Sequence, residues 1–208
     1  MKPLKEKISI TIDNDILVKL KEKAEWDIDV MSRMGVTTVE GKSGYGLDKE
    51  TEIKQLEVMK AINEDPMRKV DIATTFLGAH AVPTEYKGRE DEYIDFLIEE
   101  MLPLIQEKGL AEHCDIFCEK GVFAVEQSRR WLQAAKDKGF GVKIHADEIV
   151  SFGGAELAGE LQALSADHLL HASDAGIQAM ADNHVVATLL PLTAFTLREP
   201  YARGREMI

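Results

Sequence analysis

The heptapeptide VKIHADE, residues 142–148, has the residue types of a metal-dependent hydrolytic site. Apolar and ionisable side chains alternate along it, so an extended chain would carry Lys143, His145 and Asp147 on one face. Imidazole and carboxylate groups are ligands for zinc and ferrous iron, which activate water. We therefore expect His145 to be a metal ligand; the alternative is a buried histidine that hydrogen bonds to Asp147. Glu148, at the end of the segment, is placed to handle protons or to bind a polar substrate group.

Two glycine-containing segments carry further candidates. In SGYGL, residues 43–47, Tyr45 stands between glycines, which let the backbone approach a ligand while the hydroxyl binds it. The alternative is a tight turn with an aromatic lid. GAHAVP, residues 78–83, repeats this arrangement with His80 between small residues.

The remaining histidines differ in their expected positions. His168 and His171 belong to a predicted strand at 166–172, where a separation of three residues places them on opposite faces, so at most one faces the interior. His168 is nearer the middle of that strand and is our candidate. His113 and His184 open their strands at the opposite rim, where we expect roles in stability only.

Strand-like and helix-like segments alternate along the chain, which predicts parallel strands with helical crossovers. The predicted strands are 36–43, 70–80, 113–119, 141–147, 166–172 and 185–191. An open doubly wound sheet would need a phosphate-binding glycine loop, but GKSGYGLDKE lacks the required spacing. We therefore predict an α/β fold of the (β/α)8 TIM-barrel type, here an incomplete barrel of about six β/α units.

This architecture explains the polar residues at the strand ends. Barrel active sites are built where the carboxyl ends of the strands meet, and the candidates lie at the ends of five successive strands. They are Lys42, His80, Glu119, His145 with Asp147, and His168 with His171. A closed barrel typically needs about 250 residues, so two strands lie beyond this chain, a partner supplies them, or the sheet edges are exposed.

Several helices have recognisable ends. Asp48 precedes an amphipathic segment that ends at Asp65-Pro66. The segment 90–109 reads as a helix kinked at Pro103 and stopped at Gly109. Upstream, residues 13–35 supply the first helix.

Composition limits the classes of function. The 208 residues are 45% hydrophobic, which suits one globular unit, and 37 acidic against 25 basic side chains give a net charge of −12. This charge disfavours binding to nucleic acid or anionic membranes. We expect no secretory signal in residues 1–13 and no membrane span. Cys114 and Cys118 read as reduced core residues, so we expect a cytoplasmic location.

Several motifs, taken in order, resemble the imidazolonepropionases of the amidohydrolase superfamily from roughly residue 30 to the end. They are GVTTVEGKSGYGLDKETE, FLGAHAVPTEY, CDIFCEKGVFAVEQSRR, KIHADEIVSFGGAELA, SADHLLHAS and VVATLLPLTAF. The resemblance implies hydrolysis of the cyclic amide of 4-imidazolone-5-propanoate to N-formimidoyl-L-glutamate, a step of histidine degradation. It also implies a small-molecule substrate and adds a homodimer as a candidate assembly.

The same resemblance implies roles for individual residues. His145 corresponds to the metal ligand on the fifth strand of the family barrel. Tyr45, His80 and Glu148 correspond to residues that hold the substrate ring or the product. His168 corresponds to the histidine of the sixth strand, so that Glu148 and His168 are the expected catalytic residues.

The chain also departs from the family pattern. The family takes two further ligands from an H-x-H pair on its first strand and an aspartate from its last, and no H-x-H occurs here. Residues 1–208 therefore correspond to a partial hydrolase barrel, without the flanking β domain or the first and last strands. One divalent ion, zinc or iron, is expected in the complete enzyme, whereas binding by this chain should be weak or absent. Gly41 replaces an expected aliphatic strand residue.

Two alternatives remain open. In one, the barrel is metal-free and Lys143 forms a Schiff base in an aldolase-like site. In the other, the chain is a non-catalytic fragment that associates through open strand edges.

Overall fold

A curved sheet of six parallel strands is the centre of the molecule. The computed structural model describes the backbone of residues 4–208 and the side chains of residues 16–208; residues 1–3, part of the segment expected to carry no secretory signal, lie outside the described residues. The strands are β1 (Thr38–Lys42), β2 (Asp71–Ala79), β3 (His113–Cys118), β4 (Gly141–Ala146), β5 (Ser165–His168) and β6 (Val186–Thr188).

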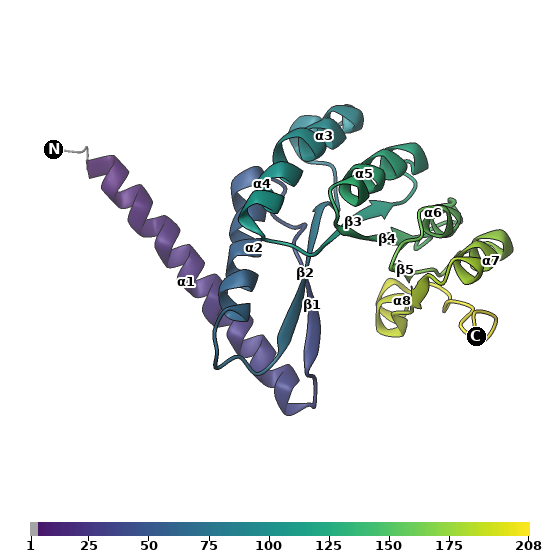
Figure 1. Ribbon diagram of the computed structural model, residues 1–208, viewed down its shortest axis with the longest axis horizontal. Coiled ribbons are helices and arrows are strands. Elements are labelled where there is room, and N and C mark those ends of the chain that lie inside the picture. Colours follow the sequence, from purple (N-terminus) through teal and green to yellow (C-terminus); the bar gives the residue numbers. More distant parts are fainter. Residues whose placement is uncertain (1–3) are drawn as a thin grey trace.

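The strand order establishes the fold class. Each strand pairs in parallel with the next in the chain, and the order β1-β2-β3-β4-β5-β6 never reverses. A doubly wound sheet requires such a reversal, so that alternative is wrong. The sheet is instead a half-barrel of the (β/α)8 type (Figure 1), and β1 and β6 each pair on one side only among the described residues.

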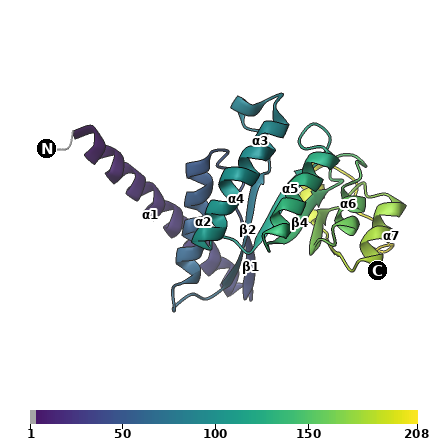
Figure 2. The ribbon, with the colours of Figure 1, turned by 45° about the horizontal axis from the view of Figure 1, so that its top comes forward.

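Helices alternate with the strands as predicted, and α2, α4, α5 and α6 lie on one side of the sheet (Figures 1 and 2). The helices are α1 (Leu4–Arg33), α2 (Lys49–Asn63), α3 (Glu90–Phe96), α4 (Leu102–Lys108), α5 (Val125–Asp137), α6 (Gly154–Glu160), α7 (Asp174–Asp182) and α8 (Pro191–Leu197), with a 3₁₀ turn η1 (Thr84–Tyr86) and a π-helical turn η2 (Leu97–Met101). Among the described residues, none of the helices combines the length and apolar character needed to cross a bilayer.

The hydrophobic core lies between the sheet and these helices. Phe76, Ile116 and Ile144 on the strands are fully buried, as are Leu56 on α2 and Trp131 on α5. The rings of Phe76 and Trp131 meet edge to face with centroids 5.8 Å apart. Burial of each such side chain contributes roughly 1.5–3 kcal/mol. The apolar face is therefore used for packing, which leaves the other face of the sheet for the site.

The residues predicted to begin or end helices do so in the structure. The Asp48 side chain caps α2 by accepting a hydrogen bond from the Thr51 N–H at 2.9 Å. Gly109 ends α4 with a left-handed φ of 57°. Between α3 and α4, the N–H of Leu102 bonds to the carbonyl of Leu97 in the turn η2. The kink expected at Pro103 is therefore a widened π-helical turn just before the proline, which has no N–H to donate.

Two predicted strands are too long. The predicted strand 166–172 ends at His168, because His168 and Leu169 have φ values of 75° and 57° and turn the chain away. The predicted strand 185–191 shortens to β6, since Pro191 already begins α8. Both predictions are therefore corrected at their carboxyl ends, where the site begins.

Candidate active site

A pocket of about 410 Å³ opens at the carboxyl ends of the strands. It is lined by Glu40, Lys42, Tyr45, His80, His145, Glu148, Asp167, His168, Thr188, Leu190 and Thr193. Strands β1, β4, β5 and β6 contribute, as do the segments that follow β1, β2, β4 and β6. The five residues expected to bind metal or substrate or to act in catalysis all line this pocket, so the fold brings together positions that are distant in the chain; they are Tyr45, His80, His145, Glu148 and His168.

The aromatic candidates form a continuous series of rings. Ring centroids are 4.7 Å apart between Tyr45 and His80, 6.0 Å between His80 and His145, and 5.2 Å between His145 and His168. Tyr45 is 79% exposed, whereas His145 and His168 are buried. The series therefore runs from the rim of the pocket to its floor, and a planar polar ligand could contact several rings at once.

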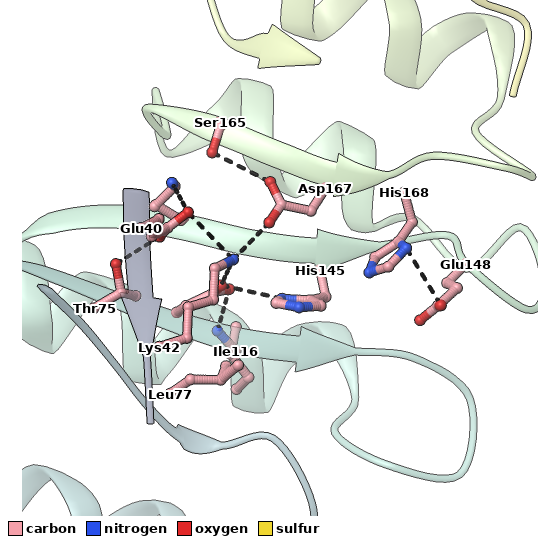
Figure 3. Close-up of polar contacts among 12 residues, drawn as sticks. Glu40, Lys42, Thr75, Leu77, Ile116, His145, Glu148, Ser165, Asp167 and His168 are labelled. Atoms are coloured by element: carbon pink, nitrogen blue, oxygen red, sulfur yellow. Dashed lines mark hydrogen bonds and ion pairs between the residues drawn. The ribbon is translucent and has the colours of Figure 1, made fainter. Parts of the chain in front are cut away.

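Glu148 lies next to His168 in the pocket (Figure 3). Its Oε1 lies 3.3 Å from Nδ1 of His168, and both side chains are buried. Burial raises the pKa of Glu148, and the charge of Glu119 adds to the effect against the opposing influence of His145. Burial also lowers the pKa of His168 to about 4, helped by repulsion from His145. The pair therefore combines a carboxyl group whose affinity for a proton is raised with an imidazole whose affinity for a proton is lowered.

A buried ion-pair cluster lies beneath the rings. The Lys42 ammonium is 2.8 Å from Oδ2 of Asp115 and 2.6 Å from Oδ2 of Asp167. Burial lowers the pKa of Lys42, but the two carboxylates raise it more, so the pKa lies well above its ordinary value. Burial raises the pKa of Asp115, but the charges of His145 and Lys42 outweigh this and hold it low. Lys42 is therefore a permanent cation inside the half-barrel (Figure 3).

His145 joins this cluster to the pocket. Its Nδ1 lies 3.1 Å from the same Oδ2 of Asp115 that contacts Lys42. Burial lowers the pKa of His145, but the Asp115 carboxylate raises it more, and the pKa is raised overall. Half-buried His80 has a lowered pKa, first because of burial and then because His145 repels its charged form.

A second ion pair, more exposed than the first, lies on the same face. The Lys143 ammonium donates to Oε2 of Glu40 at 2.7 Å, and the Thr75 hydroxyl donates to Oε1 at 2.5 Å. A Schiff-base lysine must present a neutral amine to its substrate. The Lys143 amino group is instead engaged in an ion pair with Glu40, so this geometry does not favour the aldolase-like alternative.

Asp147 has a different position from the one predicted. Its φ of 50° ends the alternation of β4, so the side chain leaves the face that carries His145. Oδ1 accepts backbone hydrogen bonds from Phe152, Gly153 and Gly154, and Oδ2 accepts one from Ala155. Asp147 therefore organises the loop before α6, and the prediction that it shares a face with His145 is wrong.

The other predicted rim residues also serve the loops. Glu119 is fully buried and accepts from the N–H groups of Lys120 and Ile149, both at 2.8 Å, which ties the loop after β3 to the loop after β4. His171 does not line the pocket; its Nε2 lies 3.6 Å from Glu199. Of the two histidines in that segment, only His168 faces the interior.

The sequence analysis missed three acidic members of the cluster, Glu40, Asp115 and Asp167. A signal was present for Asp115: Cys114 and Cys118 share the buried outer face of β3, which directs Asp115 to the inner face. Asp167 precedes His168, and the sequence analysis assigned a role only to the histidine. Their ion partner Lys42 is 73 and 125 residues away in the chain from Asp115 and Asp167, so no local pattern reveals the pairing.

Asp115, His145 and Asp167 form a group of possible metal ligands, but only part of this group is available to a divalent cation. One atom each of Asp115, His145 and Asp167 lies within 4.8 Å of the others, and carboxylate and imidazole are accepted ligands. Lys42 already contacts both carboxylates, however, so their charge is met from within the protein. The imidazole of His145, backed by a carboxylate, is the donor in this group that fits a metal ion without displacing the lysine.

Comparison with curated proteins gives a consistent family relationship. The chain is 78% identical over 190 residues to an imidazolonepropionase of Phocaeicola vulgatus, 73% identical over 191 residues to one of Bacteroides thetaiotaomicron and 62% identical over 190 residues to one of Clostridium tetani. These matches cover 91%, 92% and 91% of this chain but only 46%, 46% and 45% of the relatives, so the chain spans about half their length. No protein-family model matches the chain.

Solved structures with similar folds are more distant. The chain superposes on Arabidopsis ADAL complexed with IMP with a TM-score of 0.62 at 9% identity, over 88% of this chain and 60% of that one. Ochratoxinase of A. niger gives a TM-score of 0.54 at 14% identity, over 80% of this chain and 44% of that one. At these identities the likeness supports the barrel fold and nothing finer.

Proposed function

We propose, from the homology of this chain to the central portion of the imidazolonepropionases, that the complete protein hydrolyses 4-imidazolone-5-propanoate to N-formimidoyl-L-glutamate. The observation that carries the proposal is the convergence of Tyr45, His80, His145, Glu148 and His168 on one pocket at the carboxyl ends of the strands. The chain would be a partial hydrolase barrel domain that contributes these residues.

Substrate binding is assigned to the outer part of the pocket. The imidazolone ring is flat and polar, and the series of rings formed by Tyr45 and His80 offers it faces to stack on. The Tyr45 hydroxyl, on an exposed side chain, is available to donate or accept a hydrogen bond. His80 also stacks on Phe117, with centroids 5.9 Å apart, which supports the imidazole from behind.

The hydrolytic chemistry is assigned to the inner part. A divalent ion, zinc or iron, would supply water activation when bound, and His145 is the residue of this chain that would hold it. As a carboxylate, Glu148 would accept a proton from the attacking water and then give it to the departing ring nitrogen; its raised pKa makes it a stronger base for the first transfer. His168, 3.3 Å from Glu148, would hold that carboxyl group in position and share its proton.

The cellular setting is a further part of the proposal. We place the reaction in the cytoplasm with a small-molecule substrate, supported by the free, buried thiols of Cys114 and Cys118, which suit a reducing compartment. A homodimer remains a candidate assembly.

A chimera tests the proposal. Residues of this chain replace the matching 190-residue segment of the Phocaeicola vulgatus imidazolonepropionase, and formation of N-formimidoyl-L-glutamate is followed by chromatography and mass spectrometry. We expect turnover and bound metal in the chimera. His145→Ala should lose metal and activity together, whereas Glu148→Gln should keep the metal and lose roughly 10²–10⁴-fold in turnover.

His171→Ala is the matched control, because this histidine does not line the pocket and should leave metal content and turnover unchanged. A folded, metal-loaded chimera that forms no product would refute the function. Full metal content in the His145 variant would refute the ligand assignment.

A further inference from the structure

The Asp115 carboxylate is the best-satisfied acid of the inner face. Its side chain is fully buried, Oδ1 accepts the N–H of Ile116 at 2.7 Å, and Oδ2 is shared between Lys42 at 2.8 Å and His145 Nδ1 at 3.1 Å. Both oxygens are therefore occupied. Binding a metal ion through Asp115 would require it to give up Lys42 or His145.

Lys42 occupies the position that a cation would take in this cluster. Its ammonium lies within hydrogen-bond distance of both carboxylates, and Asp167 is further held through Oδ1 by the Ser165 hydroxyl at 3.4 Å. An ammonium ion is a compact point charge on a flexible stem, and it neutralises two buried carboxylates here without any added ion. The acids of the cluster are therefore committed to protein partners.

The contact between Asp115 and His145 defines which ring nitrogen faces the pocket. A proton on Nδ1 faces Oδ2 of Asp115 across 3.1 Å, a contact at ion-pair distance that is not aligned as a hydrogen bond in this structure, and Nε2 is then the nitrogen with a free lone pair. Metal-binding histidines commonly have such a carboxylate behind them, which fixes both the tautomer and the ring orientation.

We propose that Asp115 is a positioning residue that fixes the Nδ1–H tautomer of His145 and aims Nε2 at the pocket, and that Lys42 holds Asp115 in place for this task. This inference rests on the proposed function only in its use of His145 as the ligand. Asp115 and Asp167 are then supports rather than ligands.

The first test needs no metal and no substrate. Long-range proton–nitrogen NMR on the ¹⁵N-histidine-labelled 208-residue chain reports which nitrogen of each imidazole bears the proton. We expect Nδ1 of His145 to remain protonated when the ring is neutral. Asp115→Leu should convert the ring to the Nε2–H form, whereas Asp167→Asn, which alters the other carboxylate of Lys42, should leave the tautomer unchanged. A wild-type His145 with a bare Nδ1 would overturn the proposal, and this result requires no variant to fold.

The second test measures zinc affinity in the chimera described above, using competition with a chromophoric chelator. Asp115→Asn should weaken zinc binding roughly 10–100-fold, the usual effect of losing an outer partner of a ligand. Asp167→Asn should weaken it much less. Equal losses in the two variants would overturn the proposal, because they would indicate that both acids act alike as ligands or as general charge. The tautomer and the zinc affinity are independent of turnover, so an inactive chimera would refute the proposed function while leaving this inference to its own two tests.

Discussion

The loop that presents Glu148 depends on a single carboxylate, and its removal gives a sharp test of the structure. Asp147 is fully buried and accepts backbone hydrogen bonds from Phe152 at 2.7 Å, Gly153 at 3.0 Å, Gly154 at 3.3 Å and Ala155 at 2.9 Å. Three of these bonds end on Oδ1 and one on Oδ2. The substitutions Asp147→Asn and Asp147→Ala therefore remove different numbers of acceptors.

The expected losses follow from this count. Asn keeps one oxygen for the three N–H groups on Oδ1, but its amide would point a donor at the N–H of Ala155 and leave that group unsatisfied. Loss of a charged acceptor and one orphaned buried donor should cost about 2–3 kcal/mol. Asn also tolerates the φ of 50° at this position. Ala orphans all four donors and adds strain at positive φ, so about 4–5 kcal/mol is expected.

Urea denaturation of the 208-residue chain, followed by circular dichroism, measures these differences in the free energy of unfolding. The control is Ser173→Ala at the start of α7, which removes one side-chain acceptor, 2.9 Å from the Gly176 N–H, together with the hydroxyl donor to Glu156. That variant should lose only about 1 kcal/mol. If Asp147→Asn costs no more than Ser173→Ala, the loop is not organised by the carboxylate and the reasoning fails.

Three further outcomes are expected. Glu52→Ala should destabilise the chain by about 3 kcal/mol and accelerate amide exchange in the 44–47 loop, whose N–H groups bind this buried carboxylate; protection as strong as in the wild type would contradict this. Cys118, buried with a pKa raised to about 11 by burial, should not react with a thiol reagent at neutral pH until urea is added; reaction of the native chain would place the thiol at the surface. Gly159→Ala should lower the melting temperature, because its Cβ would lie 2.6 Å from the backbone of α7; an unchanged melting temperature would show that the helices separate at little cost.

The fold was largely predictable because its signals are local and repeated. Each strand and helix shows its own periodicity, and six repeats in one order indicate a parallel barrel type regardless of errors at single boundaries. The boundary errors have local causes without local signals. His168 and Leu169 adopt positive φ although neither is glycine, so the end of β5 could not be recognised from residue type.

Only the part of the site at the strand ends was predictable. Tyr45, His80, His145, Glu148 and His168 stand where strands end, and parallel strands end at one rim, so their grouping follows from topology. The ion-pair cluster beneath them depends on which side chains of the inner face meet inside the half-barrel. Gly41 shows the same limit: an added Cβ would lie 2.8 Å from both Ile72 and Met59, so Met59 fills the space expected for an aliphatic residue. Such pairings depend on curvature and register, which short motifs do not encode.

The lysines of the inner face explain how this arrangement can exist before any ion binds. Glu40, Asp115 and Asp167 place three carboxylates on that face, and the two buried ones, Asp115 and Asp167, would each cost several kcal/mol without a counter-charge. Lys42 and Lys143 supply counter-charges from within the chain, so folding of the sheet does not need a metal ion to neutralise its acids. In small metal-dependent domains, by contrast, the ligands come together only when the ion binds. Here the carboxylate behind His145 is already fixed, so the imidazole that we propose as the metal ligand can be oriented before an ion arrives, which would be preorganisation of the kind that catalytic metal sites use.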